Sequence, residues 1–418
     1  MSEGHRESAA SSDGTDVRTV ALAVTAGVFL GGVATGVAFP TLPLLDRVLG
    51  ISAVMLGVIL SANRIARLAM NTPAGSVIDS LGARRPMVAG LFVQGLAPFG
   101  YVAGLHTPTM ELGVFPVLGS VSAPAVVFVL ARASWGVGSA FVFVGAFAII
   151  TGVTVEGNRG KWTGYMRGGQ SLGFPTGLVV GGVVADVFDI QTAFLVAGTL
   201  AMAAGVFGWL VLPDVRSSAS QRTSLRDLPA VARSIPGVVP VGIANGGIRL
   251  LFGGVLLTTA VKYAAELDVQ TVGLTAAGVS GLVMGVGVLA SSGATVASGR
   301  ISDVLEVRAL VTLPAVGLLA FVTSLAGLVA GVVLVGIGVG SAGPALLATL
   351  GDLSPADDVG KLGGLYNVFG DVGLSLGPLL ALPAVEAVGF TVTYSVSALV
   401  AVACLLLVNA TLLATPDT

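Results

Sequence analysis

Twelve long apolar runs constrain this chain more than any other feature of its sequence. Each run holds about 20 mostly apolar residues, the length that a helix needs to cross the hydrocarbon core of a bilayer. With 54% hydrophobic residues, 10% charged residues and a mean hydropathy of +0.96, the apolar surface is too large for a soluble fold to bury. We therefore predict an all-α membrane protein with twelve transmembrane helices at 17–40, 52–74, 87–105, 124–150, 161–184, 189–212, 238–262, 271–298, 309–329, 331–350, 361–384 and 390–414.

The distribution of Lys and Arg predicts which side of the membrane each loop occupies. With both termini in the cytoplasm, fourteen of the 20 Lys and Arg residues fall in inner segments, two in outer segments and four within spans. Cytoplasmic loops carry an excess of positive charge, so this asymmetry predicts a multi-pass protein of the cell membrane with both termini inside. Residues 1–16 are polar and expected to be disordered, and 105–123 is predicted to be an outer loop.

The longest inner connection, residues 213–237, divides the spans six and six. It carries four arginines and three prolines, and it separates an N-terminal six-helix bundle at 17–212 from a C-terminal one at 238–414. An internal repeat supports this division, because a shift of 200 residues aligns glycines and a lysine at the start of the fifth span of each half. The aligned sets are Gly160, Lys161, Gly164 and Gly173 with Gly360, Lys361, Gly364 and Gly373.

Two short polar hinges lie between apolar runs, one in each half. Both place Gly and Asp four residues apart with arginine following, and the glycines allow a tight reversal of the chain. The first hinge holds Gly75, Asp79, Gly82, Arg84 and Arg85, and the second holds Gly299, Asp303 and Arg308. An aspartate at such a place can accept hydrogen bonds from the unpaired N–H groups at the start of a neighbouring helix.

The first hinge, its weaker partner, the twelve spans and the basic central loop together resemble the major facilitator superfamily over about 17–414. The resemblance implies two pseudo-symmetric six-helix bundles with a cavity lined mainly by spans one, four, seven and ten. It also implies that the hinges are cytoplasmic gates. Asp79 is then expected to contact the start of span eleven, and Asp303 the start of span five.

Glycine and proline motifs in spans five and eleven resemble the antiporter signature of the same family. Span five carries Gly169, Gly173 and Pro175, and span eleven carries Gly373, Gly377 and Pro378. Small residues four apart let helices approach, and proline supplies a kink that a moving helix can use. Ordinary helix packing explains the same residues, so both interpretations stay open for span five.

Charged residues within spans are costly and therefore usually functional. Arg132 in span four, followed by glycines, resembles a family signature associated with proton coupling; a structural pair is the alternative. A rise of about 1.5 Å per residue places Arg64, Arg249 and Asp371 near the middle of the membrane. Asp371 is the only acid deep within a span, which makes it a candidate proton carrier or the partner in a permanent salt bridge with Arg249 or Arg64.

These observations predict a secondary active transporter that works by alternating access, with protons, a small-molecule substrate and the lipid bilayer as its partners. Proton-coupled efflux of a small organic compound is favoured, and the excess of arginine within spans favours an anionic solute. Metabolite uptake by the same fold, or a non-transporting sensor or scaffold, are the alternatives. The net charge of −2 gives no basic surface for nucleic acid, and one Cys with two His offers no metal cluster or cofactor site. No nucleophile and base occur together, so we do not expect an enzyme, and the resemblance implies a monomer.

Overall fold

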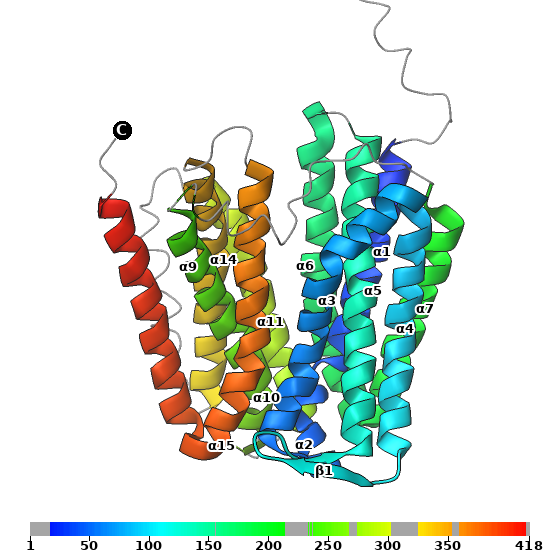
Figure 1. Cartoon of the computed structure of the whole chain (residues 1–418), viewed down its shortest axis with the longest axis vertical. Helices are drawn as coiled ribbons and strands as arrows, with labels where there is room; N and C mark the ends of the chain where they lie inside the picture. Colours follow the sequence, from blue (N-terminus) through cyan, green and yellow to red (C-terminus); the bar gives the residue numbers. More distant parts are fainter. Residues whose placement is uncertain are drawn as a thin grey trace, which may run out of the picture.

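The computed structural model describes residues 17–154, 156–213, 233, 235, 237–266, 274–301, 325–352 and 359–414. Long helices make up most of this part of the chain, and a short hairpin lies at one end of the bundle (Figure 1). The helices are α1 (Val17–Ala38), η1 (Leu42–Leu44), α2 (Leu45–Leu49), α3 (Ala53–Leu81), α4 (Arg84–His106), α5 (Ala123–Val153), α6 (Glu156–Val187), α7 (Ile190–Val211), α9 (Val238–Arg249), the π-helical η2 (Leu250–Leu256), α10 (Leu257–Glu266), α11 (Ala276–Ile301), α14 (Leu325–Asp352) and α15 (Val359–Ala414).

These helices follow the predicted spans closely within the described ranges. Nine of the described helical stretches are long and apolar enough to cross a membrane. The predicted fifth span is α6, whose first turns carry charge, and the predicted seventh span is the continuous run α9, η2 and α10. Spans eleven and twelve are the two parts of α15, which meet at Gly389 with a φ of 78°. Most of the predicted ninth span, 309–329, lies outside the described residues.

The region 105–123 differs from the plain loop that the sequence predicts, because it forms an antiparallel hairpin. Strand β1 (Glu111–Phe115) pairs with β2 (Gly119–Ser122), with an irregularity in the register near Gly113. Gly119 has a φ of +74°, a conformation that glycine adopts without strain. The membrane-spanning part is helical as predicted, and this hairpin is the one departure from an all-α chain among the described residues.

The helices form two groups that stand side by side, α1–α7 and α9–α15 (Figure 1). We call the end of the bundle that carries β1 and β2 the hairpin end, and the opposite end, where α1 begins and α15 finishes, the termini end. Within each group the first span packs on the fifth through glycines. A Cβ added to Gly36 of α1 would lie 2.7 Å from the Cα of Gly177 of α6, and one on Gly254 of η2 would lie 2.6 Å from the Cα of Gly377 of α15.

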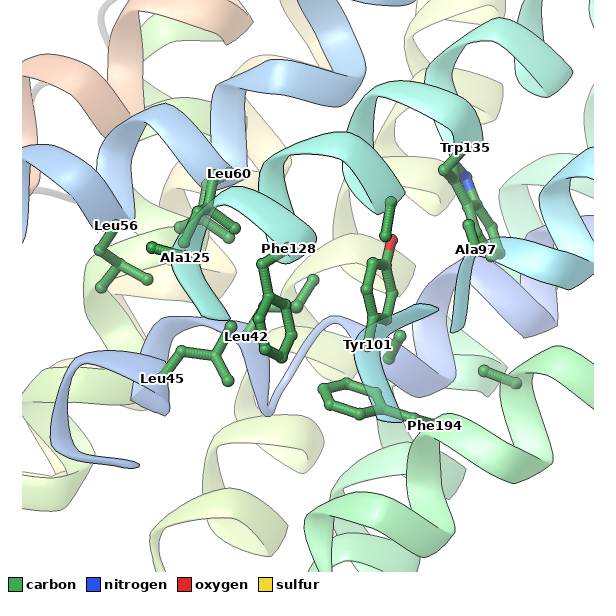
Figure 2. Close-up of a cluster of buried hydrophobic side chains, with 14 of the residues drawn as sticks. Leu42, Leu45, Leu56, Leu60, Ala97, Tyr101, Ala125, Phe128, Trp135 and Phe194 are labelled. Atoms are coloured by element: carbon green, nitrogen blue, oxygen red, sulfur yellow. The ribbon is translucent and has the colours of Figure 1, made fainter. Parts of the chain in front are cut away.

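Aromatic side chains fill the first group near the hairpin end (Figure 2). The fully buried rings of Tyr101 and Phe128 are stacked with centroids 5.7 Å apart, and Phe194 meets Tyr101 edge-on at 5.1 Å. These rings come from α4, α5 and α7, so the cluster fixes three helices against one another. The cluster therefore gives the first group an aromatic core.

Candidate functional site

A cavity of about 900 Å³ lies between the two helix groups. Its lining comes from α1, α3, α5 and α6 of the first group, from Gln94 of α4, and from α11 of the second group. The first and fourth spans therefore line the cavity as expected. Spans seven and ten were also expected to line it, but the described lining contains no residue of either span, and α11, the eighth span, lies beside the cavity instead.

At the hairpin end the two groups touch directly. A Cβ added to Gly57 of α3 would lie 3.0 Å from the Cα of Leu379 of α15, and one on Gly182 of α6 would lie 3.0 Å from the Cα of Gly281 of α11. Helices that approach this closely leave no room for a passage between their backbones.

Polar contacts reinforce this closure at its outer edge. Lys262 of α10 forms an ion pair with Asp46 of α2, with 2.5 Å between Nζ and Oδ2. The carboxylate of Asp186 of α6 accepts hydrogen bonds from the backbone N–H, at 2.6 Å, and from the hydroxyl of Thr275. Each contact joins one group to the other, so together with the glycines they form what we call the hairpin-end seal.

Toward the termini end the cavity is open. Gly164 and Arg167 of α6 and Val296 of α11, which line it there, are exposed. Asn63 and Trp135, which line it at mid-depth, are buried. Among the residues that the structure describes, the cavity is therefore closed at one face of the bundle and accessible from the other.

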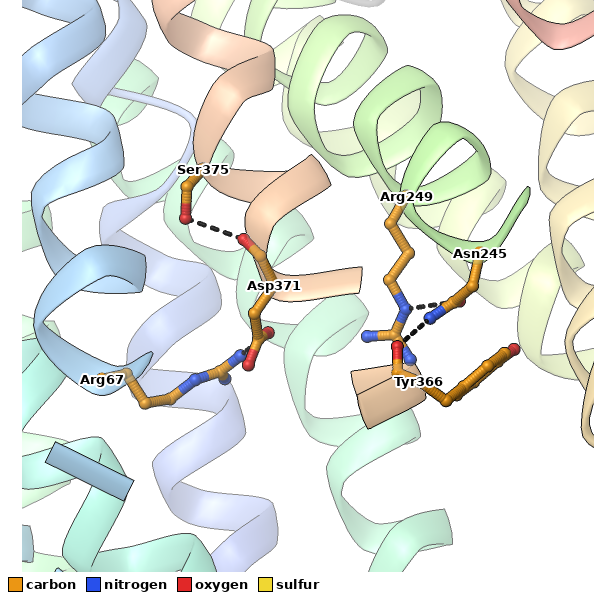
Figure 3. Close-up of polar contacts among 6 residues, drawn as sticks. All are labelled: Arg67, Asn245, Arg249, Tyr366, Asp371 and Ser375. Atoms are coloured by element: carbon orange, nitrogen blue, oxygen red, sulfur yellow. Dashed lines mark hydrogen bonds and ion pairs between the residues drawn. The ribbon is translucent and has the colours of Figure 1, made fainter. Parts of the chain in front are cut away.

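One ion pair joins the two groups at mid-depth (Figure 3). Arg67 of α3 donates through Nη2 to the carboxylate of Asp371 of α15, a residue with 7% of its surface exposed. The guanidinium of Arg67 also lies 5.8 Å from the ring centroid of Phe143, and Arg67 lines the cavity. The sequence hypothesis of a salt bridge with Arg249 or Arg64 named the wrong arginine, since depth along separate helices does not fix which side chains face each other.

Arg249 instead helps to hold α9 against α15. Its Nε donates to Oδ1 of Asn245 at 3.1 Å, and Nδ2 of Asn245 donates to the backbone carbonyl of Tyr366 at 2.7 Å (Figure 3). Arg249 is not among the described residues that line the cavity. The π-helical turn η2 begins directly after it.

Arg132 also lies away from the cavity lining. Only 5% of its surface is exposed, and its guanidinium donates to the backbone carbonyls of Leu60 at 3.2 Å and Ile59 at 3.4 Å. Both carbonyls belong to α3, so Arg132 ties α5 to α3. This geometry corresponds to the structural alternative that the sequence left open.

Arg64 and Arg167 line the cavity without a direct salt bridge, although Asp371 lies near enough to Arg64 to attract its charge. Both line the cavity, and neither makes an ion pair with any described residue. No Asp or Glu occurs among the described lining residues. Arg64 was predicted from its depth. Arg167 was not, although its spacing from Gly164 and Ser171 places the three on one face of α6.

The first hinge ends α3 and begins α4. Gly75 is buried and Asp79 is exposed in the last turns of α3, and Gly82, with a φ of +81°, ends that helix. The contact expected between Asp79 of this hinge and the start of span eleven stays a prediction. In the second hinge, Gly299 lies in the last turn of α11, whereas Asp303 and Arg308 are outside the described residues.

The two hinge arginines differ in their contacts. Nη2 of Arg84 donates to the backbone carbonyl of Trp209 at 2.5 Å, and the guanidinium lies 5.5 Å from the centroid of that ring. Arg84 therefore joins α4 to the end of α7. Arg85 is exposed.

The glycine motifs of spans five and eleven occupy equivalent places. Gly169 and Gly173 of α6 face Thr25 and Phe29 of α1, and Gly373 of α15 faces Gly246 of α9. These contacts lie within each group.

The motif prolines lie instead at the interface between groups. A Cβ on Gly285 of α11 would lie 3.4 Å from the carbonyl oxygen of Pro175, and one on Gly57 of α3 would lie 2.8 Å from that of Pro378. Each motif thus packs inside its own group and touches the other group at its proline.

Comparison with known proteins identifies the family. The model of the Major Facilitator Superfamily matches residues 24–322 and 307–418. The chain belongs to this superfamily. Membership of a family of transport proteins agrees with the expectation that the chain is not an enzyme.

Relatives and solved structures agree with this assignment. Multidrug resistance protein 2 of Bacillus subtilis (strain 168) is 23% identical over 197 residues, 47% of this chain and 44% of that protein. Quinolone resistance protein NorA of Staphylococcus aureus (strain MRSA252) is 25% identical over 191 residues, 46% of this chain and 44% of that protein. These matches therefore span less than half the length of either relative. A bacterial homolog of the human lysosomal transporter Spinster, solved in an inward-facing and occupied conformation, superposes with a TM-score of 0.72 at 14% identity, covering 95% of this chain and 96% of that one.

Proposed function

We propose that this major facilitator is a secondary active transporter that exports a small organic anion in exchange for protons by alternating access. The observation that carries the proposal is a cavity between two helix groups that is sealed at the hairpin end and open at the termini end. Rocking of the groups would break the hairpin-end seal and close the opposite end, which moves a bound solute across the bilayer.

The charge of the cavity supports an anionic solute. Arg64, Arg67 and Arg167 line it, and only Arg67 has a carboxylate partner among the described residues. Guanidinium groups bind carboxylates and phosphates with parallel hydrogen bonds, and in a cavity of reduced polarity this attraction is stronger than in water. A cationic solute would meet three arginines and, among the described lining residues, no Asp or Glu.

Asp371 supports coupling to protons. Its carboxylate is the acid that holds the two groups together at mid-depth through Arg67. Protonation would remove the negative charge and weaken the α3–α15 contact, which would let the solute-free groups rock back. Release of the proton on the cytoplasmic side would then restore the ion pair between Asp371 and Arg67. The alternative, a permanent ion pair, predicts no such exchange.

Orientation and relatives support export. The excess of Lys and Arg favours cytoplasmic termini, so the open cavity would load from the cytoplasm. Two of the relatives that match part of the chain are named for drug resistance. We also propose that a monomer suffices, because the cavity is formed by one chain. Uptake by the same cavity, or a sensor without transport, would differ in the direction or presence of flux.

Reconstituted liposomes with an imposed pH gradient test the proposal. Radiolabelled 4-hydroxybenzoate is the anionic probe and ethidium the cationic one. We expect the pH gradient to drive movement of the anion in the native protein. Asp371→Asn should lose this gradient-driven movement and retain anion exchange at equal pH. Glu386→Gln, which changes an exposed acid on the same helix, should have no effect.

Three results would contradict parts of the proposal. Full gradient-driven transport by Asp371→Asn would exclude Asp371 as the proton carrier. Movement of ethidium without the anion would exclude an anion exporter, and movement of neither would favour a sensor or scaffold.

A further inference from the structure

Two buried amide side chains line the cavity without the hydrogen bonds that buried amides normally make. Asn63 of α3 is 8% exposed and Gln94 of α4 is 4% exposed, and both line the cavity. Oδ1 of Asn63 and Oε1 of Gln94 accept no hydrogen bond from any described residue. Most buried acceptors in folded proteins are paired, so two unpaired acceptors at one cavity wall indicate that a partner arrives from outside the chain.

Gly31 of α1 lies beside one of these amides. A Cβ added to Gly31 of α1 would lie 4.0 Å from Oε1 of Gln94, and Gly31 itself lines the cavity. Trp135 and Ser139 of α5 line the same wall and are also buried. The wall therefore combines an apolar ring, a hydroxyl and two amides with a glycine next to Gln94.

An arginine outside any described salt bridge follows directly in the sequence. Arg64 is the neighbour of Asn63 on α3, lines the same cavity, and has no carboxylate partner among the residues that the structure describes. Positive charge and unpaired acceptors thus lie next to each other. A solute that satisfies both needs a negative group and, a few bonds away, an O–H or N–H donor.

We propose that the cavity selects organic anions that also carry a hydrogen-bond donor, with the anionic group on Arg64 and the donor shared by Asn63 and Gln94. This inference rests on the proposed function, because it names the class of solute for the same cavity. The terminal torsion of an amide side chain is soft, so a small rotation turns each oxygen toward the solute. Sites with buried polar groups of this kind discriminate strongly against analogues that leave those groups unpaired.

Matched carboxylates test the inference by equilibrium binding to the full chain in lipid nanodiscs. The probes are 4-hydroxybenzoate, which has both groups, and 4-methoxybenzoate, in which a methyl group replaces the donor hydrogen. We expect 4-hydroxybenzoate to bind at least about tenfold more tightly, the effect of one well-formed buried hydrogen bond. Asn63→Leu and Gln94→Met should each reduce that ratio, and binding of 4-methoxybenzoate that persists in these variants reports that they fold. Arg64→Gln should weaken both probes equally.

The amide variants have a matched control in Gln191→Met, which removes an exposed amide on α7 and should not change the ratio. Equal binding of the two carboxylates by the native chain would overturn this inference and leave the anion exporter intact. If both amide variants keep the native ratio of affinities for the two carboxylates, the inference is overturned as well, because other residues must then bind the donor. Failure of both carboxylates to bind would overturn the inference together with the anionic solute of the proposed function.

Discussion

The ion pair between Arg67 and Asp371 holds two nearly buried charges, with side chains 16% and 10% exposed. Removing one partner of such a pair leaves the other charge buried without a partner, whereas removing both is much better tolerated. We expect Arg67→Met to lower the free energy of unfolding by about 3 kcal/mol. The double variant Arg67→Met with Asp371→Leu should recover most of that loss. Thermal melting of the purified protein in detergent measures both, and a single variant as stable as the native chain would show that the pair is not closed in the membrane.

Arg132 is a second buried arginine with a different expectation. It donates to two backbone carbonyls of α3 and does not line the cavity, so its loss should affect stability before binding. We expect Arg132→Met to cost about 1–3 kcal/mol, the usual effect of losing buried hydrogen bonds to a charged group. The affinity for 4-hydroxybenzoate should be unchanged. The exposed Arg85→Met serves as the control for melting, and a selective loss of proton-driven transport in a stable Arg132→Met protein would restore its role in coupling.

At the scale of single residues, the sequence identifies which charges matter but not how they pair. Asp371 and Arg64 were predicted from their depth within spans, and the structure places Arg64 in the cavity lining and Asp371 in an ion pair. Arg67 and Arg167 were missed as site residues because depth was weighed without helix face. Their partners and neighbours lie on other helices, and the rotation of one helix relative to another is set by packing.

Glycines let α1 and α6 pack closely, and adding one methyl group at the contact tests how much this packing stabilises the protein. A Cβ on Gly36 would clash with the backbone of α6, whereas one on Gly27 of the same helix meets no atom within 4 Å. We expect Gly36→Ala to destabilise the protein by about 1–3 kcal/mol through overpacking. Gly27→Ala should be neutral or slightly stabilising, because alanine favours helix more than glycine does. Equal melting temperatures for the two variants would show that α1 and α6 can separate without cost.

Elements as a whole were more predictable than sites. The apolar runs predicted the helices and their order, because the thickness of the bilayer sets the length of a helix that crosses it. The hairpin at 111–122 was not predicted, since Gly113 and the irregular register near it interrupt the alternation that would have indicated strands. The assignment of α11 to the cavity in place of spans seven and ten depended on the contacts between groups, which no single span encodes.

The whole molecule is expected to move about the hairpin-end seal. In a Cys404→Ala background, Asp46→Cys with Lys262→Cys places two thiols where the ion pair joins the groups. A short bifunctional thiol reagent should then hold that end closed and reduce transport to the level of empty liposomes. Binding of 4-hydroxybenzoate from the open end should remain. Each single-cysteine protein with the same reagent is the control, and continued transport by the cross-linked protein would rule out opening at this seal.

The one-sided cavity also determines where the membrane potential acts. A water-filled cavity stays close to the potential of the solution it opens to, so most of the voltage falls across the hairpin-end seal. An elementary charge that moves through 100 mV gains or loses about 2.3 kcal/mol. An anion that reaches Arg64 from the termini end crosses little of that voltage, and it crosses nearly all of it when the groups rock. Voltage should therefore change the rate at which the loaded protein reorients and leave solute affinity unchanged.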